Sequence, residues 1–263
     1  VISMYPTYQQ LYDMPKSLGA DVDLWEVEED KGWLPDLDQL RRLIRPNTKM
    51  ICINNANNPT GALMDAAYLE ELVAIAKEVD AYVFSDEVYR SFDQPAPSIV
   101  DLYAKGIAVN SLSKTYSIPG IRVGWVASNT EVADILRDYR DYTMICAGVF
   151  DDMVATLVLE NKEAILERNR QIVEENLALM DAWIAKEPKA SWIRPASVST
   201  SFVKLDVNRP IEDFALELLQ DYGVLVVPGN RFDKESHVRI GYCCDKEVLQ
   251  KGLEKLSQFL NKC

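Results

Sequence analysis

Apolar and polar positions along the first half of the chain follow two periods that predict strands and helices in turn. Short apolar, β-branched runs predict strands at residues 1–4, 49–54, 81–85, 106–112 and 122–128. Residues 65–79 carry apolar side chains at helical spacing, and Asp65 is placed to cap that helix. Strands separated by helices predict an α/β fold with a mostly parallel sheet flanked by helices.

The second half of the chain has a different order of elements. A long amphipathic helix is predicted at residues 161–183, and the elements that follow are a strand at 201–207, a helix at 211–222, strands at 224–227 and 238–242, and a helix at 245–260. This is an α+β order. We therefore expect a large domain over residues 1–160, incomplete at its N-terminus, followed by a connecting helix and a small C-terminal domain over residues 161–263.

Charge and cysteine content exclude several classes of function. The 263 residues include 41 acidic and 28 basic side chains, a net charge of −13, which argues against nucleic acid or an anionic membrane surface as partner. No apolar run approaches the roughly 18 residues of a membrane span. Five cysteines form no CxxC pair, which predicts reduced thiols and a cytoplasmic location. The single histidine, His237, leaves no basis for a metal site or a Ser-His-Asp triad and is expected to be structural.

Four segments place polar side chains at or just after predicted strands, where open α/β sheets bind their ligands. Each also has a plain structural interpretation: a turn, a helix cap, a surface lysine or a salt bridge. The segments are Asn57–Gly61 (NNPTG), Ser85–Tyr89 (SDEVY), Ser111–Lys114 (SLSK) with Arg122 beyond it, and Val238–Tyr242 (VRIGY).

Taken together and in this order, NNPTG, SDEVY, SLSK with RVG, and RIGY resemble the class I/II aminotransferases, which are fold-type I enzymes dependent on pyridoxal 5′-phosphate (PLP). The resemblance runs over essentially the whole chain. It implies a large PLP-binding domain and a smaller α+β C-terminal domain. It also implies amino acid and 2-oxo acid substrates, and a homodimer in the full-length form.

The resemblance assigns the reacting residues by position. Lys114 would form the internal aldimine with PLP and then move the substrate α-proton. Asp86 would pair with the pyridinium nitrogen and keep the ring an effective electron acceptor. Asn58 and Tyr89 would hydrogen-bond the phenolic oxygen of the cofactor.

The remaining assignments concern the phosphate, the ring face and the substrate. Ser111, Ser113 and Arg122 would bind the phosphate, because hydroxyls and a guanidinium suit that group. Tyr8 of the YPTY segment would stack on the pyridine ring. Arg239 would bind the substrate α-carboxylate through both prongs of its guanidinium.

Family members extend well upstream of the YPTY segment, with an N-terminal arm, a phosphate-binding turn and a tyrosine that reaches the partner's site. We therefore expect that this chain lacks that N-terminal part and, taken alone, binds PLP more weakly than its full-length parent.

Three functions remain open from sequence. The first is an aminotransferase that moves an amino group between an L-amino acid and a 2-oxo acid. The second is a PLP-dependent carbon–sulfur β-lyase or a related lyase or synthase, and the third is the sensor half of a PLP-binding transcription regulator. The side-chain specificity of the substrate is not encoded in any motif that we find.

Overall fold

The computed structural model describes residues 1–262 and contains two β-sheets. The first has the order β2-β1-β3-β4-β5-β6, and all its neighbouring strands are parallel except β5 and β6. Its strands are β1 (Ile2–Tyr5), β2 (Asp23–Glu26), β3 (Met50–Asn54), β4 (Tyr82–Asp86), β5 (Gly106–Ser111) and β6 (Gly124–Ala127). The mostly parallel sheet expected from the sequence is confirmed.

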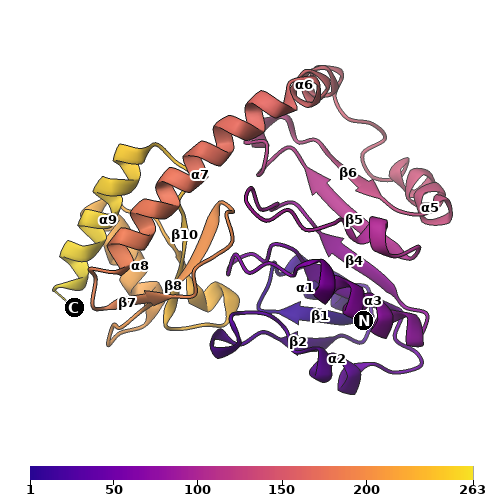
Figure 1. Ribbon diagram of the computed structural model, residues 1–263, viewed down its shortest axis with the longest axis horizontal. Coiled ribbons are helices and arrows are strands. Elements are labelled where there is room, and N and C mark those ends of the chain that lie inside the picture. Colours follow the sequence, from indigo (N-terminus) through magenta and orange to yellow (C-terminus); the bar gives the residue numbers. More distant parts are fainter. Residues whose placement is uncertain (263) are drawn as a thin grey trace.

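Helices flank this sheet (Figure 1). The predicted helix over residues 65–79 is α3 (Ala66–Glu78), and the Asp65 side chain caps it by accepting a hydrogen bond from the Tyr68 backbone N–H at 2.8 Å. Its apolar stripe is buried against the sheet in the main core. The other helical segments of this half are α1 (Gln10–Ser17), η1 (Glu29–Lys31), α2 (Leu37–Leu43), α4 (Ile99–Leu102), η2 (Pro119–Ile121), α5 (Thr130–Arg140) and α6 (Val149–Glu160).

The second sheet is antiparallel, with the order β7-β8-β10-β9. Its strands are β7 (Ala190–Trp192), β8 (Thr200–Leu205), β9 (Val227–Pro228) and β10 (His237–Gly241). Three helices share a second hydrophobic core with it. These are α7 (Lys162–Ile184), α8 (Ile211–Tyr222) and α9 (Lys246–Leu260), and the short η3 (Gly229–Phe232) precedes β10.

The strand predicted at residues 224–227 was wrong in its position. Gly223 has φ +66° at the end of α8, and its N–H donates to the Leu219 carbonyl. The bond from Gly223 to Leu219 is that of an αL cap, and the N–H of Val224 donates to the Leu218 carbonyl at the same helix end. The apolar residues after Gly223 therefore complete the helix end, and the strand begins only at Val227.

Figure 1 shows α7 running from α6, beside the first sheet, to the second sheet, so this helix connects the two halves. The N-terminus lies with the first sheet and the C-terminus with the second. The expected domain limits, 1–160 and 161–263, stay a prediction.

His237 is a core residue rather than a candidate catalyst. It is 3% exposed in β10, and its ring stacks on Phe202 with centroids 4.6 Å apart. Burial lowers the pKa of the imidazole, and the nearby Glu29 carboxylate partly opposes that shift.

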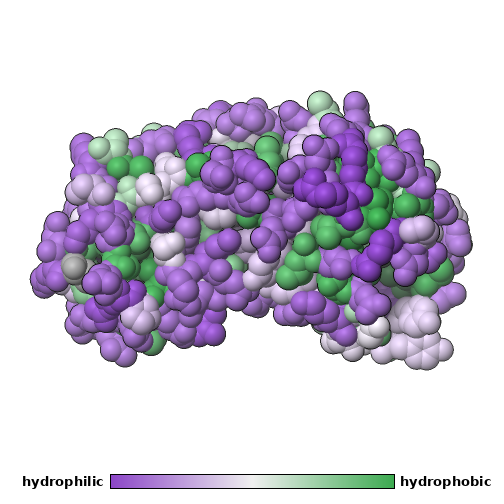
Figure 2. All heavy atoms as spheres, turned by 90° about the horizontal axis from the view of Figure 1, so that it is seen from below, coloured by the Kyte–Doolittle hydropathy of each residue, from purple (hydrophilic) through white to green (hydrophobic). Residues whose placement is uncertain are grey.

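The surface carries hydrophobic side chains as well as charge. The face seen in Figure 2 is mostly hydrophilic but includes groups of hydrophobic side chains toward both ends of the molecule. Large apolar side chains are exposed over α5, α6 and the segment between them, at Tyr139, Tyr142, Met144, Ile145, Val149, Phe150 and Met153. Within residues 1–262, no helix combines the length and the apolar content that a membrane crossing requires.

Candidate active site

The carboxyl ends of β3, β4 and β5 lie side by side, and the predicted site residues follow them. Asn54 at the end of β3 pairs in register with Asp86 at the end of β4, and Asp86 pairs with Val109 of β5. Ser111 closes β5, and Lys114 follows three residues later. Three of the four motif segments therefore meet at one edge of the sheet.

The loop after β3 is fixed by the buried side chain of Asn57. Its Oδ1 accepts a hydrogen bond from Thr7 Oγ1 at 2.7 Å, and its Nδ2 donates to the Pro6 carbonyl at 3.2 Å and to Thr60 Oγ1 at 3.0 Å. These bonds join the YPTY segment to the NNPTG loop. Tyr8 follows Thr7 directly and is thereby held near this edge, although it is 41% exposed.

A second buried amide, Asn54, connects the ends of two strands. Its Oδ1 accepts from the Asn58 backbone N–H at 2.7 Å, and its Nδ2 donates to the Asp86 carbonyl at 2.9 Å. The backbones of two predicted cofactor-binding residues are therefore held by one side chain.

Asp86 is a half-buried carboxylate without a cation beside it. Burial raises its pKa, the backbone N–H of Val88 lowers it by donating to Oδ1 at 3.0 Å, and the neighbouring Glu87 charge raises it. Within residues 1–262, no lysine or arginine forms an ion pair with Asp86. The carboxylate is therefore available to a cationic ligand.

Lys114 and Tyr89 face each other across this edge. Lys114 Nζ lies 5.6 Å from the centroid of the Tyr89 ring, and it makes no hydrogen bond or ion pair within the described residues. The lysine amine is exposed and free to react.

The three residues predicted to bind phosphate are only partly assembled. The backbone N–H of Ser113 donates to Ser111 Oγ at 3.2 Å, so the Ser111 hydroxyl lies beside the backbone of Ser113. Arg122 is exposed, and its Nη1 donates to the Pro119 carbonyl at 2.7 Å. No hydrogen bond joins Arg122 to either serine in the part of the chain that the structure describes.

Arg239 reaches this edge from the second sheet. Its Nη1 donates to the side-chain Oδ1 of Asn58 at 2.9 Å, and its guanidinium carbon lies 5.7 Å from the Phe232 ring centroid. Among residues 1–262 no carboxylate pairs with Arg239, so the structural salt bridge that the sequence left open is absent there.

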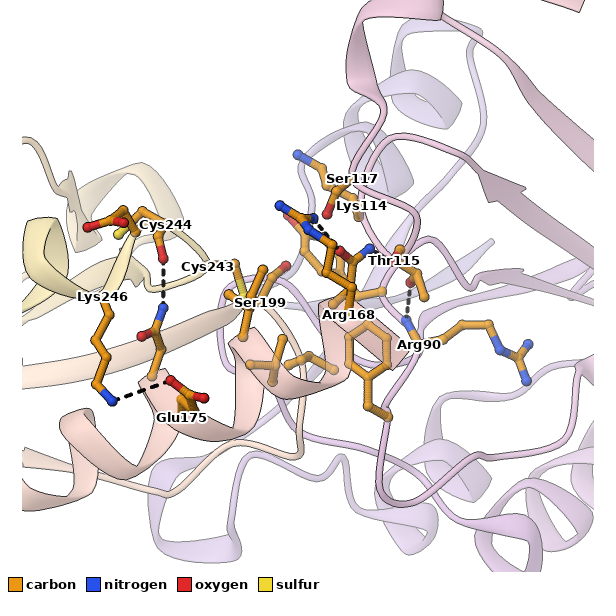
Figure 3. A pocket seen from close by; sticks show the side chains of 18 residues that line it. Arg90, Lys114, Thr115, Ser117, Arg168, Glu175, Ser199, Cys243, Cys244 and Lys246 are labelled. Carbon is orange, nitrogen blue, oxygen red and sulfur yellow. Dashed lines mark hydrogen bonds and ion pairs between the residues drawn. The ribbon is translucent and has the colours of Figure 1, made fainter. Parts of the chain in front are cut away.

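A cavity of about 550 Å³ opens beside Lys114, between the loop that carries it and the second sheet. Figure 3 shows Lys114, Thr115 and Arg168 on one side of this cavity and Cys243, Cys244 and Lys246 on the other. Arg239 and Asp86 do not line it.

Several residues that organise the site were not singled out from the sequence. Asn54, Thr115, Asn169 and Asn176 carry no motif, and their partners are distant in the chain. For Asn54, Asn169 and Asn176 the one sequence signal is an amide inside an otherwise apolar strand or helix stripe. Thr115 lies in a turn and carries no such signal.

The fold and this edge have close counterparts among solved structures. A PLP-dependent aminotransferase from Streptococcus suis superposes with a TM-score of 0.98 and 71% identity, covering 99% of this chain and 70% of that chain. An aspartate aminotransferase from Thermotoga maritima is 29% identical over 92% of this chain and 64% of its own length. Capreomycidine synthase of Streptomyces vinaceus is 27% identical over 99% of this chain and 68% of its own length. The architecture is therefore that of the fold-type I PLP-dependent enzymes.

The family model for aminotransferase class I and II matches residues 1–256, and the chain belongs to that family. It spans about two thirds of the length of these relatives, from 64% to 70%. The family resemblance expected from the sequence, with PLP as cofactor, is confirmed.

The residues present fit PLP by their chemistry. Lys114 offers an unpaired amine for the aldehyde, and Asp86 offers a carboxylate without a cationic partner for a protonated ring nitrogen. Ser111 and Ser113, two residues apart in one loop, carry hydroxyls of the kind that bind phosphate.

Proposed function

We propose that the protein transfers an amino group between an L-amino acid and a 2-oxo acid, with PLP bound at Lys114. The observation that carries this proposal is the bond between Arg239 and Asn58. It sets a guanidinium without a carboxylate partner beside the edge that holds Lys114 and Asp86. A planar guanidinium binds a carboxylate through two parallel hydrogen bonds, which suits an α-amino acid.

PLP, when bound, withdraws electrons from the bonds of the substrate α-carbon. Lys114 would take the proton from that carbon with Nζ and return it at C4′ of the cofactor, as nucleophile and general acid/base in turn. Asp86 would hold the proton on the ring nitrogen, since a carboxylate beside a protonated pyridine raises the pKa of that nitrogen.

The other residues would orient the ring. Tyr89 and Asn58 would donate hydrogen bonds to the phenolic oxygen, and Tyr8 would cover one ring face. Ser111 and Ser113 would bind the phosphate, and Arg122 would join them once its guanidinium leaves the Pro119 carbonyl.

Chemical trapping tests the proposal directly. The protein is mixed with PLP, reduced with borohydride, digested and mapped by mass spectrometry. A phosphopyridoxyl group on Lys114 alone is expected, together with 2-oxo acid formed from an amino donor only when an acceptor is present. Labelling scattered over surface lysines would contradict the assignment of Lys114.

A second candidate is a lyase or synthase with the same cofactor, and the similarity to a capreomycidine synthase favours including it. Both reactions begin with the loss of a substrate proton to Lys114. Release of pyruvate and ammonia from cystathionine without any 2-oxo acid would identify a carbon–sulfur lyase. Strict dependence on an acceptor would identify the aminotransferase.

We also propose that the protein works as a homodimer in the cytoplasm. The exposed apolar side chains between Tyr139 and Met153 would be available for a subunit contact, and the four described cysteines are free thiols. Light scattering on the purified protein would measure its mass, and a monomer at micromolar concentration would contradict the dimer.

A further inference from the structure

Helix α7 buries two amide side chains in an otherwise apolar stripe. Its buried positions are Asn169, Val173, Asn176, Leu177 and Met180. A buried amide is costly unless it is hydrogen-bonded, so each asparagine needs a defined partner. Seven residues are close to two helical turns, so Asn169 and Asn176 lie on the same face, about 10 Å apart along the axis.

Asn169 binds the loop that carries Lys114. Its Nδ2 donates to the Thr115 carbonyl at 2.9 Å, and Thr115 is the residue after Lys114. Thr115 Oγ1 in turn accepts from the Arg90 backbone N–H and donates to the Val88 carbonyl, each at 3.1 Å. Those two bonds enclose the position of Tyr89, so the anchor at Asn169 extends to the pair formed by Lys114 and Tyr89.

Asn176 binds the end of the strand that carries Arg239. Its Nδ2 donates to the Tyr242 carbonyl at 2.7 Å and to the Cys244 carbonyl at 2.8 Å. Tyr242 directly follows β10 and lies three residues after Arg239. Both hydrogens of this amide are therefore used to fix one strand end.

Both anchors line the cavity beside Lys114. Its walls include Lys114 and Thr115 on one side and Cys243 and Cys244 on the other, as Figure 3 shows. The bond from Arg239 to Asn58 also joins the halves, but a substrate carboxylate would compete for that guanidinium. Other contacts also join the halves, among them the bond from the Ala196 N–H to the Gly61 carbonyl at 3.0 Å. The two amides of helix α7 differ from these contacts because they bond beside Lys114 and beside the strand that carries Arg239.

We propose that Asn169 and Asn176 are positioning residues that set the distance between the lysine that holds the cofactor and the arginine that binds the substrate carboxylate. Asn169 acts on the Lys114 side and Asn176 on the Arg239 side. This inference rests on the proposed function, and it assigns a separate effect to each residue.

Isosteric substitutions separate the two effects. Asn169→Asp keeps an oxygen for the Arg168 guanidinium, which donates to Asn169 Oδ1 at 3.0 Å, but removes the donor to Thr115. Asn176→Asp removes both donors to the end of β10. The measurements are the dissociation constant of PLP by absorbance titration and the inhibition constants of the unreactive carboxylates succinate and hydrocinnamate.

Asn169→Asp is expected to weaken PLP roughly tenfold, the size of one net hydrogen bond, and to change carboxylate binding less than twofold. Asn176→Asp is expected to weaken carboxylate binding roughly tenfold and to change PLP binding less than twofold. The control is Asn161→Asp at the start of α7, where an exposed amide also donates to a backbone carbonyl, that of Leu157, at 2.8 Å. It should change neither constant.

The inference would be overturned if each variant weakened PLP binding and carboxylate binding equally. It would also be overturned if neither variant weakened either of them. Circular dichroism establishes that each variant folds, and Asn169→Ala and Asn176→Ala replace any aspartate variant that does not. If the unsubstituted protein fails to trap PLP at Lys114, the proposed function falls first. If the PLP adduct forms at Lys114 but the two variants affect PLP and carboxylate binding alike, only the inference about α7 is overturned.

Discussion

The guanidinium Nη1 of Arg239 lies 2.9 Å from the amide oxygen of Asn58, so a side chain of the antiparallel sheet bonds directly to the loop after β3. Asn58 is itself tied to β4 through Asn54. A group proposed to bind substrate and a group proposed to bind cofactor thus share one hydrogen bond. A ligand that changes the position of Arg239 would therefore also change the hydrogen bonding of Asn58.

Arg239→Lys should lower kcat/KM for the amino donor by roughly 10- to 100-fold, mostly through KM, because an ammonium cannot make the two-pronged contact with a carboxylate. Steady-state kinetics over a range of donor concentrations measure the change. Arg231→Lys is the control, since that arginine is exposed and pairs with Glu212. A full loss of kcat with unchanged KM would contradict the assignment.

Asp86→Asn should stabilise the cofactor-free protein at neutral pH while abolishing PLP-dependent activity. Burial raises the pKa of Asp86 above its ordinary value of 3.8, so the folded state binds the proton more tightly than the unfolded state. The stability that this group contributes is complete at acid pH and is lost as pH rises through the folded pKa. Between pH 4, close to the ordinary pKa of 3.8, and pH 8, urea unfolding should show a smaller fall in the free energy of unfolding for the variant than for the unsubstituted protein. An unchanged fall would refute this reasoning. Asp21→Asn on the surface is the control.

Gly61→Ala should destabilise the fold by about 1–3 kcal/mol. Gly61 has φ +71°, and an added Cβ would overlap the side chain of Pro195 and lie 2.9 Å from the Thr200 carbonyl. Gly252→Ala in α9 meets no atom within 4 Å and should instead stabilise by up to about 1 kcal/mol. Chemical denaturation compares the two, and equal effects would show that the NNPTG loop does not require this backbone.

Asn57→Ala should cost about 2–4 kcal/mol, because it leaves the Thr7 hydroxyl and the Pro6 carbonyl without their partner in a buried site. It should also weaken PLP binding, because Thr7 would lose its bond to the NNPTG loop and would hold the neighbouring Tyr8 less firmly. Thermal unfolding and a PLP titration measure the two effects. Asn208→Ala, at an exposed position, should alter neither, and a stable Asn57 variant would argue against the network.

Much of the fold was predictable because the local signals were strong. The helix over residues 211–222 was predicted to the residue, since an apolar stripe runs up to a glycine that accepts a left-handed backbone. The same glycine made the next strand hard to place. The apolar residues at 224–226 look like a strand in sequence, yet Val224 belongs to the helix cap.

Helices α5 and α6 were not predicted. In α5 an apolar stripe is present at helical spacing but none of its residues is buried, so the sequence signal was there and was missed. Helix α6 is apolar on more than one side and lacks the single stripe that identifies a helix packed on one core.

The candidate site divides in the same way. Lys114, Asp86, Asn58 and Tyr89 could be proposed from the sequence because each lies in a short motif at the end of a strand, and strand ends can be recognised locally. Asn54, Asn169 and Asn176 could not be proposed in this way, because the role of each amide depends on a carbonyl partner that lies up to 68 residues away in the sequence. The orientation of Arg122 likewise depends on a contact that no spacing reveals.

The spacing of the two buried amides on α7 also limits how this gene can change over time. Each residue added to or deleted from the stretch between Asn169 and Asn176 would turn one anchor by about 100° relative to the other and point it away from its carbonyls. Substitutions at the exposed positions between them would leave both anchors in place. The stretch should therefore vary in sequence among natural variants while its length stays constant.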